Sequence, residues 1–273
     1  MIKSVEFGDK LFASKSELFK ALKDNREKLI ELKKAAVKNS SGLSFNHFEH
    51  NGSELKALSM EDGYIYPVIN TTKYMDSHND VHIDGIWNKS VKEQQGKIFY
   101  IADHNLSLPT VIAFPKDVEM MLETMPFSEL GSNLNGNTQA LIFKVSKDAI
   151  QMKEASRVIE DKIPIEHSVR MQYVTLFLAV NSVEDGYKEE KANWDTYFPM
   201  IANKEVAEGR GYFWAVTEAK IYKEGSMVLA GSNDITPLLQ KDIEPLENTQ
   251  EKDEPLKDTH KKRIPNGVRT IFY

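Results

Sequence analysis

Residues 163–180 read IPIEHSVRMQYVTLFLAV, and this stretch is the strongest indicator of the fold class. Over residues 166–173 polar side chains alternate with apolar or aromatic ones, which is the two-residue period of a β-strand with one polar face. From Val174 the run becomes apolar on both faces, which predicts a strand that enters the core. We therefore expect Ser168 on the polar face, at the exposed beginning of a core strand.

Other segments on both sides of this stretch are also dense in β-branched and aromatic residues, and we expect helices between them over 116–124, 148–160 and 187–208. Irregularly spaced strands with occasional helices predict an α+β fold that is mainly antiparallel, either a β-barrel or a β-sandwich surrounded by helices. The sequence has no GxGxxG or GxxxxGK[ST] motif, which disfavours nucleotide-binding α/β folds. The expected strand segments are YIYPVINTT (64–72), KIFYIAD (97–103), TVIAF (110–114), QALIFKV (139–145), GYFWAVTEAKIY (211–222) and SMVLAG (226–231).

The two ends of the chain differ in composition from the middle. Residues 1–40 contain a basic helical pattern over 14–38, capped by Ser14 and Glu17, and we expect an N-terminal helical appendage. The alternative is a helix that packs on the core. A linker over 41–62, rich in Asn, Ser and Gly, precedes the main domain, residues 63–239. The acidic residues 240–273 predict a disordered tail.

The composition excludes several kinds of chemistry. The 273 residues include no cysteine, so thiol nucleophiles, disulfides and cysteine-based zinc sites are impossible. The net charge is −6, from 35 Lys and Arg against 41 Asp and Glu, and this predicts no global attraction to nucleic acid. No apolar run approaches the ~18 residues of a membrane span, and we expect neither a standard secretory signal nor a membrane segment.

A row of carboxylates and imidazoles recurs at two-residue spacing in the segment DSHNDVHID, residues 76–84. On a strand these side chains would project from one face, as a divalent-metal site requires. The alternative is a loop whose Asp and His side chains bond their own backbone, and we expect no bound metal here. A metal-dependent hydrolase, with His104 as a further ligand, remains an alternative function. The row consists of Asp76, His78, Asp80 and His82.

A second set of residues suits nucleophilic catalysis. His104 follows directly on the strand segment 97–103, where a rigid backbone would aim its imidazole, although a satisfied surface histidine is the alternative. A serine becomes a nucleophile when a base takes its proton and a third group orients that base. The sequence offers Ser168, with His104 as base and Glu224 as orienter. Sequence spacing alone does not show whether they meet.

Four motifs in order carry a resemblance to a known family. They are MDSHNDVHIDGIWNKS (75–90), His104 after a β-run, EHSVRMQY (166–173), and EGSMVLAGSN (224–233) followed by Thr236 and Pro237. Together they resemble the prohead proteases of tailed bacteriophages, most closely the members from Bacteroidetes phages, over roughly residues 64–237. That family is similar to the herpesvirus assembly proteases, which implies a β-barrel wrapped by helices.

The resemblance also implies roles for single residues. Ser168 matches the nucleophile of the family and His104 its general base. Glu224 matches the acidic third member best, with Glu218 as runner-up, because Lys223 looks like a one-residue insertion before the motif.

One further residue departs from the family pattern. The family commonly has glycine two residues after the serine, where this chain has Arg170. A fixed positive donor beside developing negative charge is what an oxyanion requires, so Arg170 is a candidate for stabilising an oxyanion directly or through water.

The function that the resemblance implies is that of a procapsid maturation protease. Such a serine endopeptidase works without cofactor in the host cytoplasm, inside the phage procapsid, and cleaves scaffold protein, major capsid protein and itself. The herpesvirus relatives suggest a homodimer, and we expect no membrane partner and no specific nucleic acid. A non-enzymatic assembly or scaffold protein is the second alternative.

Overall fold

The computed structural model describes residues 1–39 and 58–241, so most of the expected linker and nearly all of the expected tail lie outside the described residues. Residues 1–241 form one unit. Its described part holds six α-helices and three β-sheets, two of them antiparallel and one mixed, which confirms the α+β class. No closed barrel is found in this part of the chain. None of its helices is both long enough and apolar enough to cross a membrane.

The helices are α1 (Lys15–Asp24), α2 (Arg26–Ala35), α3 (Asn88–Gln94), α4 (Lys153–Glu160), α5 (Lys188–Tyr197) and α6 (Lys204–Arg210). The strands are β1 (Ile2–Lys3), β2 (Leu11–Phe12), β3 (Lys38–Asn39), β4 (Tyr64–Thr71), β5 (Asp80–His82), β6 (Phe99–Ala102), β7 (Val111–Ala113), β8 (Val118–Pro126), β9 (Asn137–Ser146), β10 (Glu166–Val180), β11 (Tyr212–Val228) and β12 (Leu238–Leu239).

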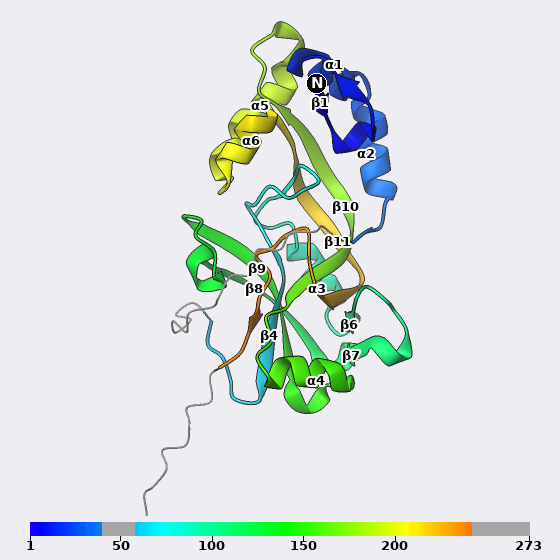
Figure 1. The fold of residues 1–273 in the computed structure, drawn as a ribbon, viewed down its shortest axis with the longest axis vertical. Coiled ribbons are helices and arrows are strands. Elements are labelled where there is room, and N and C mark those ends of the chain that lie inside the picture. The colour runs from blue at the N-terminus through cyan, green and yellow to red at the C-terminus, as the bar shows by residue number, and fades with distance from the viewer. Residues whose placement is uncertain (40–57, 242–273) are drawn as a thin grey trace, which may run out of the picture. The chain divides into compact units, whose positions relative to one another are not determined.

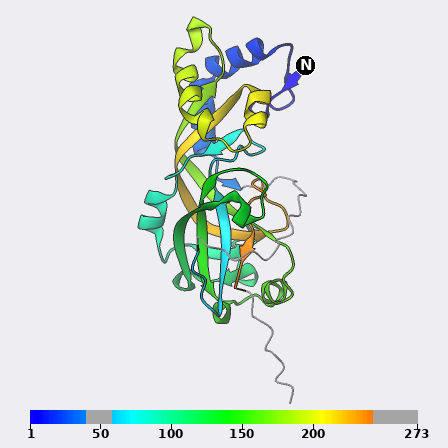
Figure 2. The ribbon, with the colours of Figure 1, turned by 90° about the vertical axis from the view of Figure 1, so that its left-hand side faces the viewer.

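The longest strands, β10 and β11, form an antiparallel pair that organises the molecule. They belong to a six-stranded sheet in the order β3-β10-β11-β6-β7, in which β5 also pairs with β11. Both β5 and β6 run parallel to β11, whereas β10 runs antiparallel to it. Figures 1 and 2 show this pair passing from the region of the second sheet to the end where α1, α2, α5 and α6 lie.

The second sheet has four strands in the order β12-β4-β9-β8, all antiparallel. Ile69 of β4 and Phe143 of β9 lie in the same buried cluster as Trp214 of β11, so one core joins the two sheets. A smaller cluster under α5 and α6 is built on Trp194 and Phe213, whose ring centroids lie 5.2 Å apart. Burial of the large aromatic side chains is the main stabilising contribution in both buried clusters.

The N-terminal segment forms two helices, where the sequence analysis expects a single helix over 14–38. The Asn25 side chain donates to the Ala21 carbonyl at 2.8 Å and its backbone leaves helical geometry, which ends α1 before α2 begins. Ser14 caps α1 by accepting from the Glu17 backbone N–H at 3.2 Å. Leu18 and Leu22 of α1 and Leu29 of α2 are buried and belong to the main core cluster.

The expected helix over 116–124 is wrong, because β8 occupies Val118–Pro126 and pairs with β9 along its whole length. Its Met, Leu and Glu residues have helical propensity, but cross-strand pairing and the burial of Val118 and Met120 override it. The segment 187–208 is helical as expected but divides into α5 and α6. Pro199 lies in the short 3₁₀ turn between them, where a regular helix would lose a backbone hydrogen bond.

Candidate active site

Three neighbouring strands bring the candidate catalytic residues to one place. Ser168 on β10 lies directly opposite Ser226 on β11, and Glu224 precedes Ser226 by two positions, so it shares the same face. On the other side of β11, β6 runs parallel and pairs Ala102 with Met227. The chain leaves β6 immediately before His104, which therefore emerges beside Glu224 and Ser226.

The structure brings Ser168, His104 and Glu224 into one hydrogen-bonded line. His104 Nε2 lies 2.7 Å from Ser168 Oγ, and His104 Nδ1 lies 2.8 Å from Glu224 Oε1. Ser168 and Glu224 are fully buried, and the His104 side chain is 7% exposed. An ionised carboxylate only accepts, so Nδ1–H donates to Glu224 and Nε2 of the neutral ring accepts from the Ser168 hydroxyl. This tautomer is the one that a general base requires.

The turn that carries His104 is held in a strained conformation. Asp103 and His104 have φ of 52° and 53°, in the left-handed region that non-glycine residues seldom adopt. Each such residue costs on the order of 1–3 kcal/mol, and surrounding contacts must offset that cost. Two hydrogen bonds do so, from the Asp103 N–H to the Met227 carbonyl and from the His104 N–H to Ser226 Oγ, both 3.0 Å long.

Glu224 stands at a bulge in β11, and not before a new strand as the sequence analysis expects. The two segments expected at 211–222 and 226–231 are largely one continuous strand, β11. Its register with β10 changes between the pairs Met171–Ile221 and Val169–Gly225, so β11 carries more residues than β10 over this step. Lys223, the residue that looks inserted, lies in this bulge with φ of 70°.

Close packing against the second sheet explains why residue 225, between Glu224 and Ser226, is a glycine. A Cβ atom at Gly225 would lie 2.6 Å from Phe143 Cε2 and 3.0 Å from Ile69 Cγ2, both in the second sheet. Since successive residues of a strand point to opposite faces, Gly225 meets that sheet while Glu224 and Ser226 face His104. The missing side chain allows the two sheets to approach each other directly behind the site.

The beginning of β10 is anchored by His167, next to Ser168. His167 Nδ1–H donates to the Thr236 carbonyl at 2.9 Å, and Nε2 accepts from the Tyr100 hydroxyl at 2.9 Å. Burial lowers the pKa of His167 to about 4, so the ring is neutral at pH 7. Asn233 holds the turn that carries Thr236, accepting from the Ile235 N–H and presenting its carbonyl to the Thr236 hydroxyl. The segment from Asn233 to Thr236 thus positions the beginning of β10, the strand that carries Ser168.

The polar face of β10 is less exposed than the alternation predicts. Ser168 is buried and Arg170 is only partly exposed, so the expected exposed beginning of this strand is wrong. The His104 turn and the β11 carboxylate cover this face and supply it with polar partners, which sequence periodicity does not reveal.

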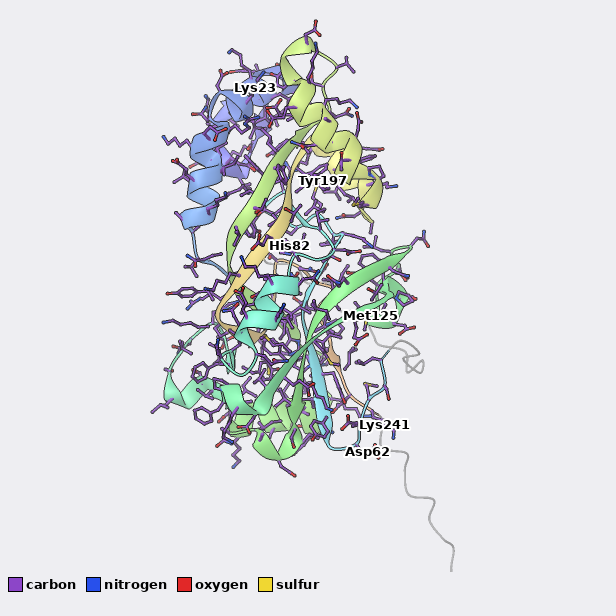
Figure 3. The ribbon with its side chains drawn as sticks, turned by 180° about the vertical axis from the view of Figure 1, so that it is seen from behind. Lys23, Asp62, His82, Met125, Tyr197 and Lys241 are labelled. Atoms are coloured by element: carbon purple, nitrogen blue, oxygen red, sulfur yellow. The ribbon has the colours of Figure 1, made fainter. Side chains whose placement is uncertain are left out.

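Asp80 and His82, from the expected metal row, lie in a buried hydrogen-bond network around β5. Asp80 pairs with Lys33 of α2 at 2.5 Å and accepts from the Tyr173 hydroxyl at 2.8 Å. His82 lies 3.2 Å from that hydroxyl through Nε2 and 3.0 Å from Asn70 Oδ1 through Nδ1. Figure 3 shows His82 beside the long strands β10 and β11 of the six-stranded sheet.

Asp76 and His78, the other half of the row, lie in the turn that precedes β5. Asp76 Oδ1 accepts from the backbone N–H groups of His78 and Asp80 at 2.8 and 3.0 Å. This is the loop alternative, in which an aspartate bonds its own backbone. In the described residues no group of three or more His, Asp or Glu side chains is arranged to hold a metal ion.

Glu218, the runner-up to Glu224, and Arg170, the candidate for stabilising an oxyanion, have different neighbours. Glu218 lies 3.2 Å from Lys89 of α3 and is partly exposed. Arg170 Nη2 donates to the His104 carbonyl at 3.2 Å, and its Nε lies 3.5 Å from Glu224 Oε1. Ser226 is a site residue that sequence reasoning missed. Its position two residues after Glu224, on the same face of the strand, could have indicated that it lies in the site.

Comparisons of the chain with models of protein families, with curated proteins and with solved structures find no match. The fold and site by themselves define an α+β protein with a buried Ser–His–Glu arrangement held across three adjacent strands. The geometry of this site and the sequence motifs are therefore the basis for the function proposed below.

Proposed function

We propose that this protein is a serine endopeptidase. The observation that carries the proposal is the single imidazole of His104, bonded through one nitrogen to the Ser168 hydroxyl and through the other to the Glu224 carboxylate. A serine, a base and an orienting carboxylate in this order are the groups that acyl transfer needs.

Each residue then has one task in peptide hydrolysis. Ser168 Oγ attacks the scissile carbonyl carbon while His104 Nε2 takes the hydroxyl proton. Glu224 stabilises the imidazolium that forms, and His104 returns the proton to the leaving amine. A water molecule, activated by the same histidine, hydrolyses the acyl-enzyme and releases Ser168.

The substrate class in this proposal comes from the resemblance to prohead proteases. The enzyme would cleave phage scaffold and major capsid proteins, and itself, inside the procapsid in the host cytoplasm, and the herpesvirus relatives suggest that it acts as a homodimer. The finer fold, a herpesvirus-protease-like barrel, belongs to the same proposal. In support, the family positions for nucleophile, base and acid fall on the three residues that meet in space.

The chemistry can be tested without a known substrate. A fluorophosphonate probe reacts with an activated serine: the Oγ–P bond forms, the P–F bond breaks, fluoride leaves and the histidine takes the proton. We expect intact-mass analysis to show one adduct on the wild type, mapped to Ser168, and none on Ser168→Ala or His104→Ala. An unlabelled, folded wild type would contradict the serine-hydrolase proposal.

The biological substrate requires a second experiment. Wild type or Ser168→Ala would be co-expressed with the capsid and scaffold proteins, and new protein termini mapped by mass spectrometry. Termini that appear only with the wild type and persist with chelator would support the proposal. Cleavage that survives Ser168→Ala but not chelator would indicate a metal-dependent hydrolase. No cleavage while procapsids form would indicate a non-enzymatic assembly protein.

A further inference from the structure

The Ser–His–Glu line is embedded in contacts from two more residues, Ser226 and Arg170. Ser226 Oγ donates to Glu224 Oε2 at 2.8 Å and accepts from the His104 backbone N–H at 3.0 Å. Its one hydroxyl hydrogen is therefore committed to the carboxylate, while its oxygen holds the histidine backbone. Ser226 is fully buried, so solvent does not compete for either bond.

Arg170 contacts the same two residues from β10. Its Nη2 donates to the His104 carbonyl at 3.2 Å, and its Nε lies 3.5 Å from Glu224 Oε1. While the histidine is neutral, Glu224 is a buried anion, and such a charge is costly unless a cation faces it. Arg170 supplies that cation through its guanidinium group.

Together the two side chains hold both ends of the His104 residue, its N–H and its C=O, and contact both oxygens of Glu224. The left-handed backbone of His104 needs such support, because its relaxation would carry the imidazole away from Ser168. Base and orienter are thereby held in place before a substrate arrives, as efficient catalysis requires.

We propose that Ser226 and Arg170 are positioning residues that act on Ser168 through His104 and Glu224. The inference rests on the proposed serine chemistry and extends it from three residues to five. It also gives Arg170, where the related family commonly has glycine, a role in this chain that differs from direct contact with an oxyanion.

The test measures the rate of fluorophosphonate labelling at Ser168, normalised to folded protein. This reaction depends on His104 and makes little use of peptide-binding contacts, so it reports the state of the base. We expect Ser226→Ala and Arg170→Met each to slow labelling roughly ten-fold or more, since small misplacements of reacting groups cost up to ~10²-fold. With a peptide substrate, kcat should fall and KM should change little.

Two matched variants remove similar groups elsewhere. Ser90 is also buried, its Oγ accepts from the Ile221 backbone N–H at 2.9 Å, and it donates to Gln94, so Ser90→Ala deletes the same kinds of bond away from the site. Arg26 pairs with Glu27, Glu189 and Glu190, so Arg26→Met removes an arginine that faces three carboxylates. Both variants should label at the wild-type rate per folded molecule, whatever their thermal stability.

Conservative variants separate positioning from folding. Ser226→Thr keeps the hydroxyl and Arg170→Lys keeps the charge, and each should recover part of the labelling rate lost in the Ala or Met variant. Wild-type labelling rates in both Ser226→Ala and Arg170→Met would overturn this inference and leave the proposed function standing. If Ser226→Ala does not fold, Arg170→Met, at a partly exposed position, decides the result. An unlabelled wild type would instead reject the proposed function itself.

Discussion

Glu224 and Glu218 show how the surroundings of one residue decide its chemistry, although both stand on β11. Glu224 is fully buried, shares hydrogen bonds with His104 and Ser226, and forms an ion pair with Arg170, so its carboxylate is fixed in one orientation. Glu218 is partly exposed and pairs with Lys89, whose side chain is itself 63% exposed. Exposed ion pairs of this kind contribute little to stability and do not constrain a catalytic group.

The first residue-scale prediction separates the two glutamates. Glu224→Gln should slow Ser168-dependent cleavage and fluorophosphonate labelling roughly ten-fold or more, because an amide no longer stabilises the imidazolium. Glu218→Gln should stay near wild type. Both rates are compared at equal fractions of folded protein, measured by circular dichroism. The reverse ranking would remove Glu224 from its proposed role.

The second residue-scale prediction concerns pH and His167. The pKa of the buried ring is lowered to about 4, against about 6.5 for an unfolded histidine. Between these values the unfolded chain binds more protons, so the stabilising contribution of neutral His167 is complete above pH 6.5 and is lost as the pH falls toward 4. The loss should reach about 3 kcal/mol at pH 4.

Urea unfolding at pH 7 and pH 4 measures this effect. The difference in unfolding free energy between the two pH values should be about 3 kcal/mol smaller in His167→Gln than in the wild type. An equal pH dependence in both proteins would show that other groups cause the acid sensitivity.

At the scale of the element, β11 contributes to the candidate site with one face and to the contact with the second sheet with the other. Its bulge at Lys223 aims Glu224 and Ser226 toward His104, and Gly225 between them meets Phe143 and Ile69 of the second sheet. The same three residues thus form the candidate site on one face and the contact between the sheets on the other, so packing behind the strand and the geometry of the site in front of it are coupled.

Gly225→Ala should therefore be disruptive although the change is one methyl group. The new Cβ would lie under 3.0 Å from the Phe143 ring, and overpacking of this kind costs about 1–3 kcal/mol. We expect a lower free energy of unfolding in urea, accompanied by slower labelling of Ser168. Gly209→Ala is the control, since Gly209 is exposed in α6 and a methyl group there would have nothing within 4 Å, so this variant should be neutral or slightly stabilising. Equal stability of both variants would contradict the close sheet contact.

At the scale of the whole molecule, the N-terminal helices are joined to the long strands by a buried charge pair. Lys33 of α2 reaches Asp80 of β5 and lies 5.3 Å from the centre of the Trp214 ring of β11. Burial by itself lowers the pKa of Lys33, but the charges of Asp80 and Glu6 outweigh it, so the pKa is raised. The lysine thus stays charged beside its partner.

Lys33→Met should destabilise the protein by about 3 kcal/mol, because it leaves the buried Asp80 carboxylate without this cation. Urea unfolding of Lys33→Met, Asp80→Asn and the double variant measures the coupling between the two sites, and the double variant should lose less than the sum of the single ones. Lys28→Met, at an exposed position of the same helix, should be close to neutral. Additive losses would show that the pair is not coupled.

The local sequence determined much of what surrounds the site. Alternation and β-branched residues are local properties of the chain, and they predicted the strands over 64–72, 139–145 and 167–180 and the α+β class. Motif order also selected Ser168, His104 and Glu224, which the structure brings together. The same local rules misjudged 116–124, where pairing with β9 decided for a strand.

Only the tertiary structure decided how these residues meet and what supports them. The parallel pairing of β6 with β11, the bulge at Lys223 and the contacts of Ser226 and Arg170 depend on strands far apart in sequence. The row at residues 76–82 also depends on tertiary contacts, although its spacing is that of a metal-ligand set. Its Asp80 and His82 instead contact Lys33, Tyr173 and Asn70. Side-chain spacing along a chain defines a face, whereas the partners on that face come from elements that the spacing does not encode.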